Sequence, residues 1–172
     1  MEDIIVNRVA QSGILTLNLE DFYPKKEMVL FDIKNYLYME LMLKEKEFRT
    51  SLKELDWSIY ENQHVAITCT TDAIVPIWAY MLIAAYLEPI AASMVFGDLE
   101  LLKTLLFDKA LGKINPEDYR DKRVVVKGCG DKAVPISAYV EITRLLKPVV
   151  KSIMYGEPCS TVPIYKQPML RK

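Results

Sequence analysis

Cysteines, glycines and charged residues follow several short apolar segments of this sequence. Cys69, Cys129 and Cys159 each come just after such a segment, and together they are all the cysteines of the chain. The segments are short and rich in β-branched residues, which is typical of buried strands. At the carboxyl ends of parallel strands these residues would form a ligand site. The predicted site residues are Thr70, Asp72, Cys129, Gly130, Asp131, Lys132, Glu157, Cys159 and Ser160.

Three kinds of chemistry fit these turns. An anion could bind at the start of the helix after Gly130, with added charge from Lys132, although a capping Asp131 would occupy the same amides. A metal site, with zinc or an iron–sulfur cluster, could use Cys129 and Cys159, but it needs further ligands. A thiol nucleophile is the third possibility, because a helix N-terminus lowers the pKa of a cysteine.

Each candidate also has a structural interpretation. Cysteine is a small apolar residue that packs well at strand ends, and Cys69 fits this best. Asp72 and Asp131 are suitable N-caps for the helices that follow. The only histidine, His64, precedes its strand at the opposite end, so we expect a surface residue rather than a Cys–His pair.

The elements that position these residues occur twice, at an offset of 59 positions. Residues 60–97 and 119–156 align without a gap and share 13 identities in 38 positions. Each copy reads as a strand, a helix and a second strand, so the strands of each pair should be parallel. The matched positions 76, 79, 80, 83 and 87 form one face of a helix, which we expect to lie on the sheet.

The fold class predicted is α/β, with a mainly parallel sheet built from two tandem strand–helix–strand repeats and an N-terminal β segment. Residues 4–6 and 13–19 predict that segment, as a hairpin or edge pair. Residues 162–165 indicate a further edge segment, and Asp98 should cap a helix over 98–111. We expect one domain over 1–172, with the internal repeat at 60–98 and 119–157.

Composition excludes several classes of function. The chain has 172 residues and a net charge of −1 with mixed signs, so neither nucleic acid nor an anionic membrane is an expected partner. Residues 73–87 form an apolar run of 15, shorter than the roughly 20 that a membrane-spanning helix needs. Cysteines without a framework spacing and a start without a basic signal region predict a cytoplasmic protein.

The first-copy helix is apolar on both faces. Trp78, Leu82 and Ala85 stand where the second copy has Ser137, Glu141 and Arg144. Because a large exposed apolar surface usually marks a contact, this helix predicts a homodimer, unless residues 1–28 cover it within one chain.

Four stretches carry a resemblance that covers nearly the whole chain: LEDFYP at 19–24, DAIVPIWAY at 72–80, VKGCGD at 126–131 and SIMYGEPCSTV at 152–162. They resemble a family of uncharacterised bacterial proteins. The resemblance implies no activity and no catalytic residues.

The hypothesis that these patterns favour is a non-catalytic binding or accessory protein, which uses the strand-end loops for a small ligand, a metal or an iron–sulfur-related role. The first alternative is a thiol-dependent enzyme using Cys129 or Cys159. The second alternative is a protein-interaction module.

Overall fold

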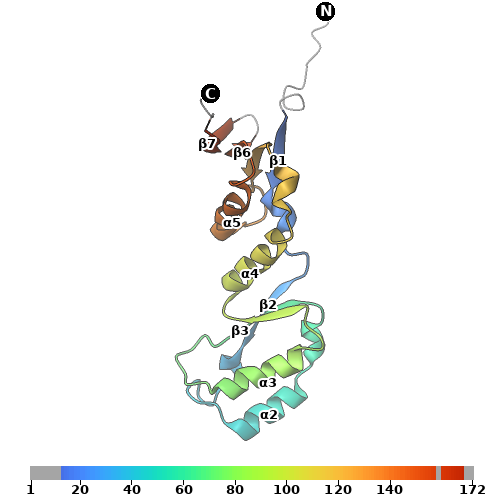
Figure 1. Cartoon of the computed structure of the whole chain (residues 1–172). Coiled ribbons are helices and arrows are strands. Elements are labelled where there is room, and N and C mark those ends of the chain that lie inside the picture. The colour runs from blue at the N-terminus through green and yellow to red at the C-terminus, as the bar shows by residue number, and fades with distance from the viewer. Residues whose placement is uncertain (1–12, 158–159, 169–172) are drawn as a thin grey trace, which may run out of the picture. The chain divides into compact units, whose positions relative to one another are not determined.

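The computed structural model describes residues 13–157 and 160–168, and the chain divides into two compact units. Unit 1 is Met1–Tyr23 with Leu106–Lys172, and unit 2 is Pro24–Leu105. In the sequence, unit 2 is therefore inserted between the two parts of unit 1, as the colours of Figure 1 show.

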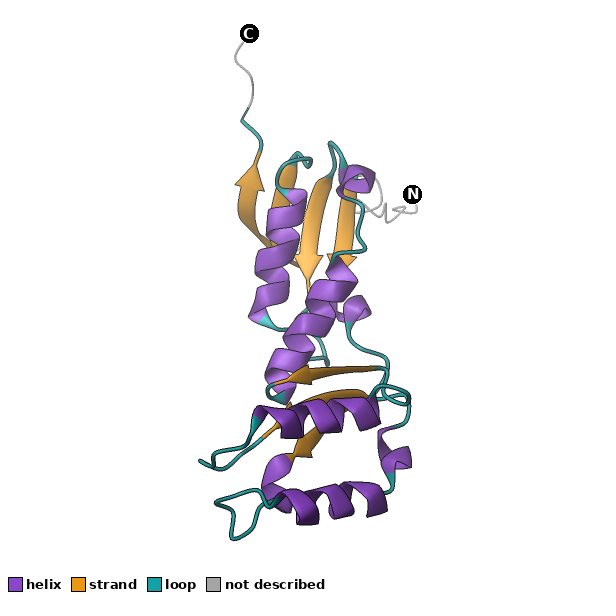
Figure 2. Cartoon of the chain, turned by 60° about the horizontal axis from the view of Figure 1, so that its bottom comes forward, coloured by secondary structure: helices purple, strands orange, loops and turns teal. Residues whose placement is uncertain are grey.

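Unit 2 is built on a parallel three-stranded sheet. Its strands are β2 (Met28–Asp32), β3 (His64–Thr68) and β4 (Ser93–Phe96), in the order β2-β3-β4. Its helices are α2 (Glu45–Glu54) and α3 (Ile77–Leu87), with short 3-10 helices at Ile33–Tyr36 and Trp57–Tyr60. Figure 2 shows these helices against the strands of the unit.

Unit 1 is built on a four-stranded sheet with the order β1-β5-β6-β7. β1 (Ile14–Asn18), β5 (Arg123–Lys127) and β6 (Ser152–Glu157) are parallel, and β7 (Ser160–Lys166) is antiparallel to β6. The unit also contains α5 (Ile136–Leu146) and 3-10 helices at Leu19–Phe22 and Pro116–Tyr119. The boundary between the units falls within α4 (Leu99–Leu111).

The mixed α/β class, the mainly parallel pairing and the N-terminal strand are as predicted. β1 is an edge strand parallel to β5, and the segment at residues 4–6 lies outside the described residues. β7 confirms the predicted edge segment at residues 162–165. The structure has two sheets where the sequence predicted one.

The three parallel strands of each unit have the same order and register. His64 lies opposite Ser93 in unit 2, and Arg123 lies opposite Ser152 in unit 1, 59 positions further along in each case. A third strand pairs in the same way, because Met28 lies opposite His64 and Ile14 lies opposite Arg123. Superposition of the two units as copies of one repeat stays a prediction.

Each unit has its own hydrophobic core, and the helix face expected to lie on the sheet is buried in both. Ala79, Ile83 and Leu87 are buried in unit 2. Ala138, Ile142 and Leu146 are their buried counterparts in unit 1. The pattern of identities therefore predicted the buried face correctly.

The predicted helix starts were partly wrong. α3 and α5 begin after Pro76 and Pro135, which occupy the N-cap positions without a side-chain cap, so Asp72 and Asp131 are not caps. The proline ring disfavours helical backbone in the residue before it, and each proline is itself extended, with ψ values of 142° and 147°, so each helix begins at the next residue. Asp98 does cap α4, because its carboxylate accepts a 2.8 Å hydrogen bond from the amide of Leu101.

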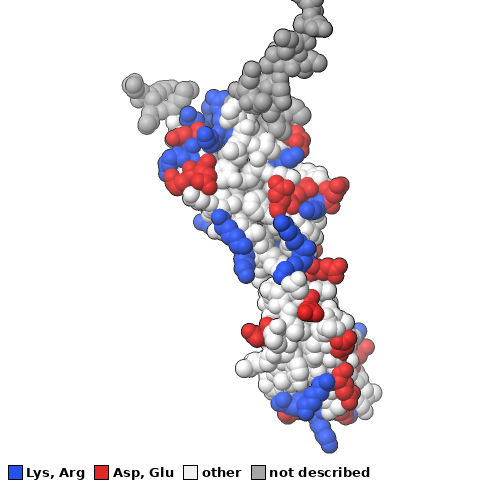
Figure 3. Space-filling view, turned by 90° about the vertical axis from the view of Figure 1, so that its right-hand side faces the viewer, with Lys and Arg blue, Asp and Glu red and all other residues white. Residues whose placement is uncertain are grey.

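Charged side chains of both signs are interspersed on the face shown in Figure 3. The described ion pairs are mostly local, such as Arg49 with Glu45 in α2. None of the helices in the described part of the chain has the length and hydrophobicity needed to cross a membrane.

Candidate functional site

The turn after β5 is the best-defined polar site of unit 1. Val124, Val125 and Val126 are buried, which fixes β5 in the sheet, and the chain then leaves the strand through Gly128, Cys129 and Gly130. The carboxyl ends of the parallel strands β1, β5 and β6 meet at this edge. Ligands bind at this edge in open parallel sheets.

Two hydrogen bonds hold the turn in place. The hydroxyl of Tyr139 in α5 donates to the carbonyl oxygen of Gly128 at 2.8 Å. The amide of Gly130 donates to the carboxylate of Glu20, which comes from the 3-10 helix after β1. Glu20 thus occupies an amide that a bound anion would need, which argues against the predicted anion site.

The two glycines permit these close approaches. A Cβ at position 128 would lie 2.6 Å from the Tyr139 hydroxyl and 3.2 Å from the Cβ of Leu19. A Cβ at position 130 would collide with the carboxylate of Glu20. A larger residue at either position would therefore displace a side chain that fixes the turn.

Cys129 lies between these glycines and its side chain is exposed. Its sulfur is 2.5 Å from the hydroxyl of Tyr155 in β6. This hydrogen bond, together with the repulsion that an ionised Cys129 would exert on a phenolate, raises the pKa of the Tyr155 phenol. Tyr155 therefore stays protonated and can donate to the sulfur.

Tyr139 of α5 lies beside the pair formed by Cys129 and Tyr155. Burial raises the pKa of Tyr139 to about 12, and the negative charges that Cys129 and Tyr155 would carry when ionised add to the effect. The ring centres of Tyr139 and Tyr155 are 5.8 Å apart, and the two rings make an edge-to-face contact. Both hydroxyls are therefore neutral hydrogen-bond donors at physiological pH.

A polar cavity of about 160 Å³ opens at the strand ends beside Cys129. Lys127 at the end of β5 forms an ion pair of 3.5 Å with Glu157 at the end of β6. The cavity combines a thiol, a cation and two carboxylates. Its lining consists of Asn18, Glu20, Lys127, Gly128, Cys129, Gly130 and Glu157.

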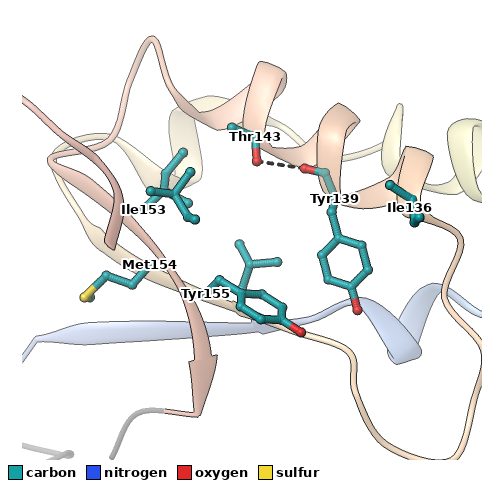
Figure 4. Close-up of a pocket in the computed structure, with 8 residues that line it drawn as sticks. Ile136, Tyr139, Thr143, Ile153, Met154 and Tyr155 are labelled. Carbon is teal, nitrogen blue, oxygen red and sulfur yellow. Dashed lines mark hydrogen bonds between the residues drawn. The ribbon is translucent and has the colours of Figure 1, made fainter. Parts of the chain in front are cut away.

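A larger apolar cavity of about 380 Å³ lies between α5 and β6 (Figure 4). Tyr139 and Tyr155 line it with their rings, so the same two side chains border the apolar cavity and contact the Cys129 turn. The other lining residues are Val126, Ile136, Thr143, Ile153, Met154 and Ile164.

The equivalent turn of unit 2 is held by a hydrogen-bonded pair. Thr70, at the position of Cys129, donates to the Asp32 carboxylate from its amide at 3.1 Å and from its hydroxyl at 2.5 Å. Burial alone would raise the pKa of Asp32, but the hydrogen bonds from Thr70 and from the amide of Lys34 bring it below its usual value. Cys69 is partly buried against the core of unit 2.

The predicted site residues are divided between the two units. Cys129, Gly130 and Glu157 line the polar cavity of unit 1. Asp131 and Lys132 are exposed in the following loop, with the Lys132 ammonium 5.7 Å from the centre of the Tyr23 ring.

Ser160 is opposite Glu157 at the start of β7, whereas Thr70 and Asp72 belong to unit 2. Cys159 lies outside the described residues, so its joining Cys129 in one site stays a prediction. Within the described ranges, no three metal-binding side chains lie close enough together to hold an ion.

Sequence reasoning missed four residues of the site. Asn18 ends β1 and Glu20 follows it, and the strand-end rule would have included both had β1 been placed beside β5. Lys127 at the end of β5 and Tyr155 within β6 were treated only as strand residues. The single histidine, His64, belongs to unit 2, where its Nδ1 lies 2.7 Å from the Ser93 hydroxyl. The side chain that contacts the Cys129 sulfur is the phenol of Tyr155.

Comparison with known proteins gives one assignment. A family described as "Protein of unknown function (DUF2480)" matches residues 3–167. The chain belongs to this family. The match spans both units and agrees with the resemblance seen in the sequence. No curated protein and no solved structure matches the chain.

Proposed function

We propose that this member of the family is a cytoplasmic, non-catalytic binding or accessory protein. Its ligand would occupy the polar cavity at the strand ends of unit 1. The observation that carries the proposal is the exposed Cys129 sulfur, 2.5 Å from the Tyr155 hydroxyl at the edge of that cavity. Free thiols at Cys69 and Cys129 suit a reducing cytoplasm.

The cavity favours a small polar ligand. A volume of about 160 Å³ admits a compact molecule or one group of a larger molecule. Lys127 can bind an anionic group, while Glu20 and Glu157 can bind a cationic one. Zinc or an iron–sulfur cluster at Cys129 and Cys159 is the metal version of this proposal, because thiolates are preferred ligands of both.

A thiol-dependent enzyme is the second candidate. The Tyr155 phenol can donate a hydrogen bond to a thiolate and stabilise it, although it is a weaker base than the histidine that usually activates a cysteine. A protein-interaction module is the third candidate, and the exposed apolar residues of unit 2 favour it.

Native mass spectrometry and metal analysis of the purified protein test these candidates, with Cys129→Ser as the variant and Cys69→Ser as the control. A small molecule or metal that is lost in Cys129→Ser and kept in Cys69→Ser supports the binding protein. Rapid alkylation of a metal-free Cys129, slowed by Tyr155→Phe, supports the enzyme. A protein without ligand and with ordinary thiol reactivity contradicts both.

We also propose a homodimer, with neither nucleic acid nor a membrane as partner. The predicted surface was the α3 face with Trp78, Leu82 and Ala85. Trp78 contacts Phe48 within unit 2, and Leu82 packs against the core of that unit, so Ala85 is the most accessible of the three. The exposed neighbours that would extend this surface are Ile77 and Met81, which are 79% and 67% exposed.

Light scattering at about tens of micromolar protein tests the dimer, since that range covers weak association. Ile77→Lys should shift the protein toward monomer. Ile136→Lys is the matched control, because Ile136 begins α5 at the equivalent position and is 82% exposed. An unaltered dimer in Ile77→Lys would contradict a contact through this face.

A further inference from the structure

Each unit has an apolar cavity between its second helix and its last parallel strand. The cavity of unit 2 measures about 280 Å³ and that of unit 1 about 380 Å³. Six residues that line the first cavity have their counterparts, 59 positions later, in the lining of the second. They are Ile67, Tyr80, Ala84, Met94, Val95 and Phe96, matched by Val126, Tyr139, Thr143, Ile153, Met154 and Tyr155.

The two cavities differ in what lies beside the strand. In unit 1, β7 pairs antiparallel with β6, and its Ile164 completes the lining. In unit 2, the chain turns into α4 after Gly97, and within the described ranges no strand pairs with the outer edge of β4. Phe96 at this edge is 69% exposed. Unit 1 therefore shows what unit 2 lacks: an antiparallel strand with an apolar side chain over the cavity.

The groups left open on β4 follow from its pairing with β3. The amide of Gly97 donates to the carbonyl oxygen of Ile67 at 2.9 Å, so Gly97 faces β3. Backbone groups alternate along a strand, so Val95 also faces β3 while Met94 and Phe96 present their N–H and C=O groups outward. Such an edge is a template for pairing with another strand.

β4 itself carries no charged side chain, and the stretch before it carries few; the nearest charges after it, Asp98 and Glu100, belong to the start of α4. Between residues 65 and 97 the only charged side chains are Asp72 and Glu88, whereas the equivalent stretch 124–156 carries seven. By contrast, Lys25 and Lys26 precede the edge strand β2. Charged residues on edge strands discourage pairing, and β4 has none.

We propose that a second copy of this chain pairs its own β4 antiparallel with this edge, giving a continuous six-stranded sheet. The proposal rests on the homodimer proposed above and adds to its α3 surface a contact through the neighbouring edge of β4, because Met81 of α3 and Phe96 of β4 line the same cavity. A surface with almost no charges does not select a partner of opposite charge. A second copy presents the same uncharged strand edge, so the two edges can pair without bringing like charges together. Two identical strands paired antiparallel are related by a two-fold axis, the commonest symmetry of dimers.

The outward groups determine the register. Met94 pairs with Phe96 of the second copy, and Phe96 with Met94 of the second copy, so that every open N–H and C=O of the two residues gains a partner. Val95 then lies opposite Val95 of the second copy, at a non-hydrogen-bonded position. Opposite Cα atoms at such positions are about 4.5 Å apart, which is within the range for a disulfide.

Cysteine cross-linking tests this register. Val95→Cys is made in a chain that also carries Cys69→Ser, Cys129→Ser and Cys159→Ser, and mild oxidation should link most of the protein as a dimer. Met154→Cys in the same background is the control, because Met154 is the equivalent residue and already lies opposite Pro163 of β7. We expect no linked dimer from the control.

A charge on the edge gives a second measurement. Phe96→Lys should weaken dimerisation at least about tenfold by sedimentation, while Ile136→Lys should not. A dimer that persists in Phe96→Lys, without cross-linking in Val95→Cys, would overturn the strand pairing and leave the homodimer intact. A monomeric wild-type protein at tens of micromolar would overturn both, and would leave the β4 edge open to a strand from another protein.

Discussion

Replacing Tyr139 with phenylalanine should destabilise unit 1 through one hydrogen bond. The substitution removes the hydroxyl that donates to the Gly128 carbonyl at 2.8 Å. A neutral hydrogen bond contributes about 0.5–1.5 kcal/mol, and a buried group left without its partner costs about 1–3 kcal/mol. Because Gly128 is buried, we expect a loss of about 1–2 kcal/mol and a fall in Tm of about 2–8 °C.

Tyr80→Phe is the matched control. Tyr80 is the equivalent residue of α3 and contacts Phe96 through its ring, and no hydrogen bond of its hydroxyl occurs among the described residues. Its replacement should change stability by less than about 0.5 kcal/mol. Urea unfolding followed by circular dichroism measures both variants. Equal losses in the two variants would refute the assignment of the effect to the Gly128 bond.

The same variant should change the alkaline limit of stability. Folding raises the pKa of Tyr139 from 10.0 to about 12, mainly through burial. The folded state therefore keeps a proton that the unfolded chain loses near pH 10. The contribution of Tyr139 to the free energy of unfolding is complete below pH 10 and is lost as pH rises toward 12. Tyr139→Phe should lose less stability than the wild type over this range.

Three further predictions concern other parts of the chain. Ile83→Ala and Ile142→Ala should each cost about 2–5 kcal/mol, with faster hydrogen exchange in the unit that carries the substitution. Thr70→Val should destabilise unit 2 at pH 7, and this loss should shrink as pH falls below 3.8, because the lowered pKa of Asp32 contributes stability that is lost as pH falls through it. Asp98→Ala should cost about 1 kcal/mol in urea unfolding, and Asp98→Asn much less.

The sequence was most informative where one repeat copy could be checked against the other. The strand pairs around α3 and α5, their parallel direction and the buried helix faces all follow from the matched positions. The helix starts did not follow, because Pro76 and Pro135 are extended and the loops before them are longer than a capping aspartate allows. Alternation and β-branching identify strands but do not say which sheet β1 and β2 join.

The polar cavity around Cys129 was predictable only in part, because several of its contacts join residues that are far apart in the sequence. Cys129 and Gly130 were found from their place after a strand. Glu20 approaches them from 110 positions away, and no local pattern links the two. Tyr155 is 26 positions from Cys129, and its orientation toward the sulfur depends on the twist and pleat of β6.

The insertion of unit 2 between β1 and the rest of unit 1 has a consequence for synthesis on the ribosome. β1 emerges early, yet Ile14 pairs with Arg123, 123 − 14 = 109 residues later. Chains are made from the N-terminus, and segments fold as their partners appear. Unit 2 can therefore fold before β5 is synthesised, while β1 is still unpaired. The turn around Cys129 gains Glu20 only at that late stage. The proposed ligand site is therefore complete only after β6 has been made and β1 has paired with β5.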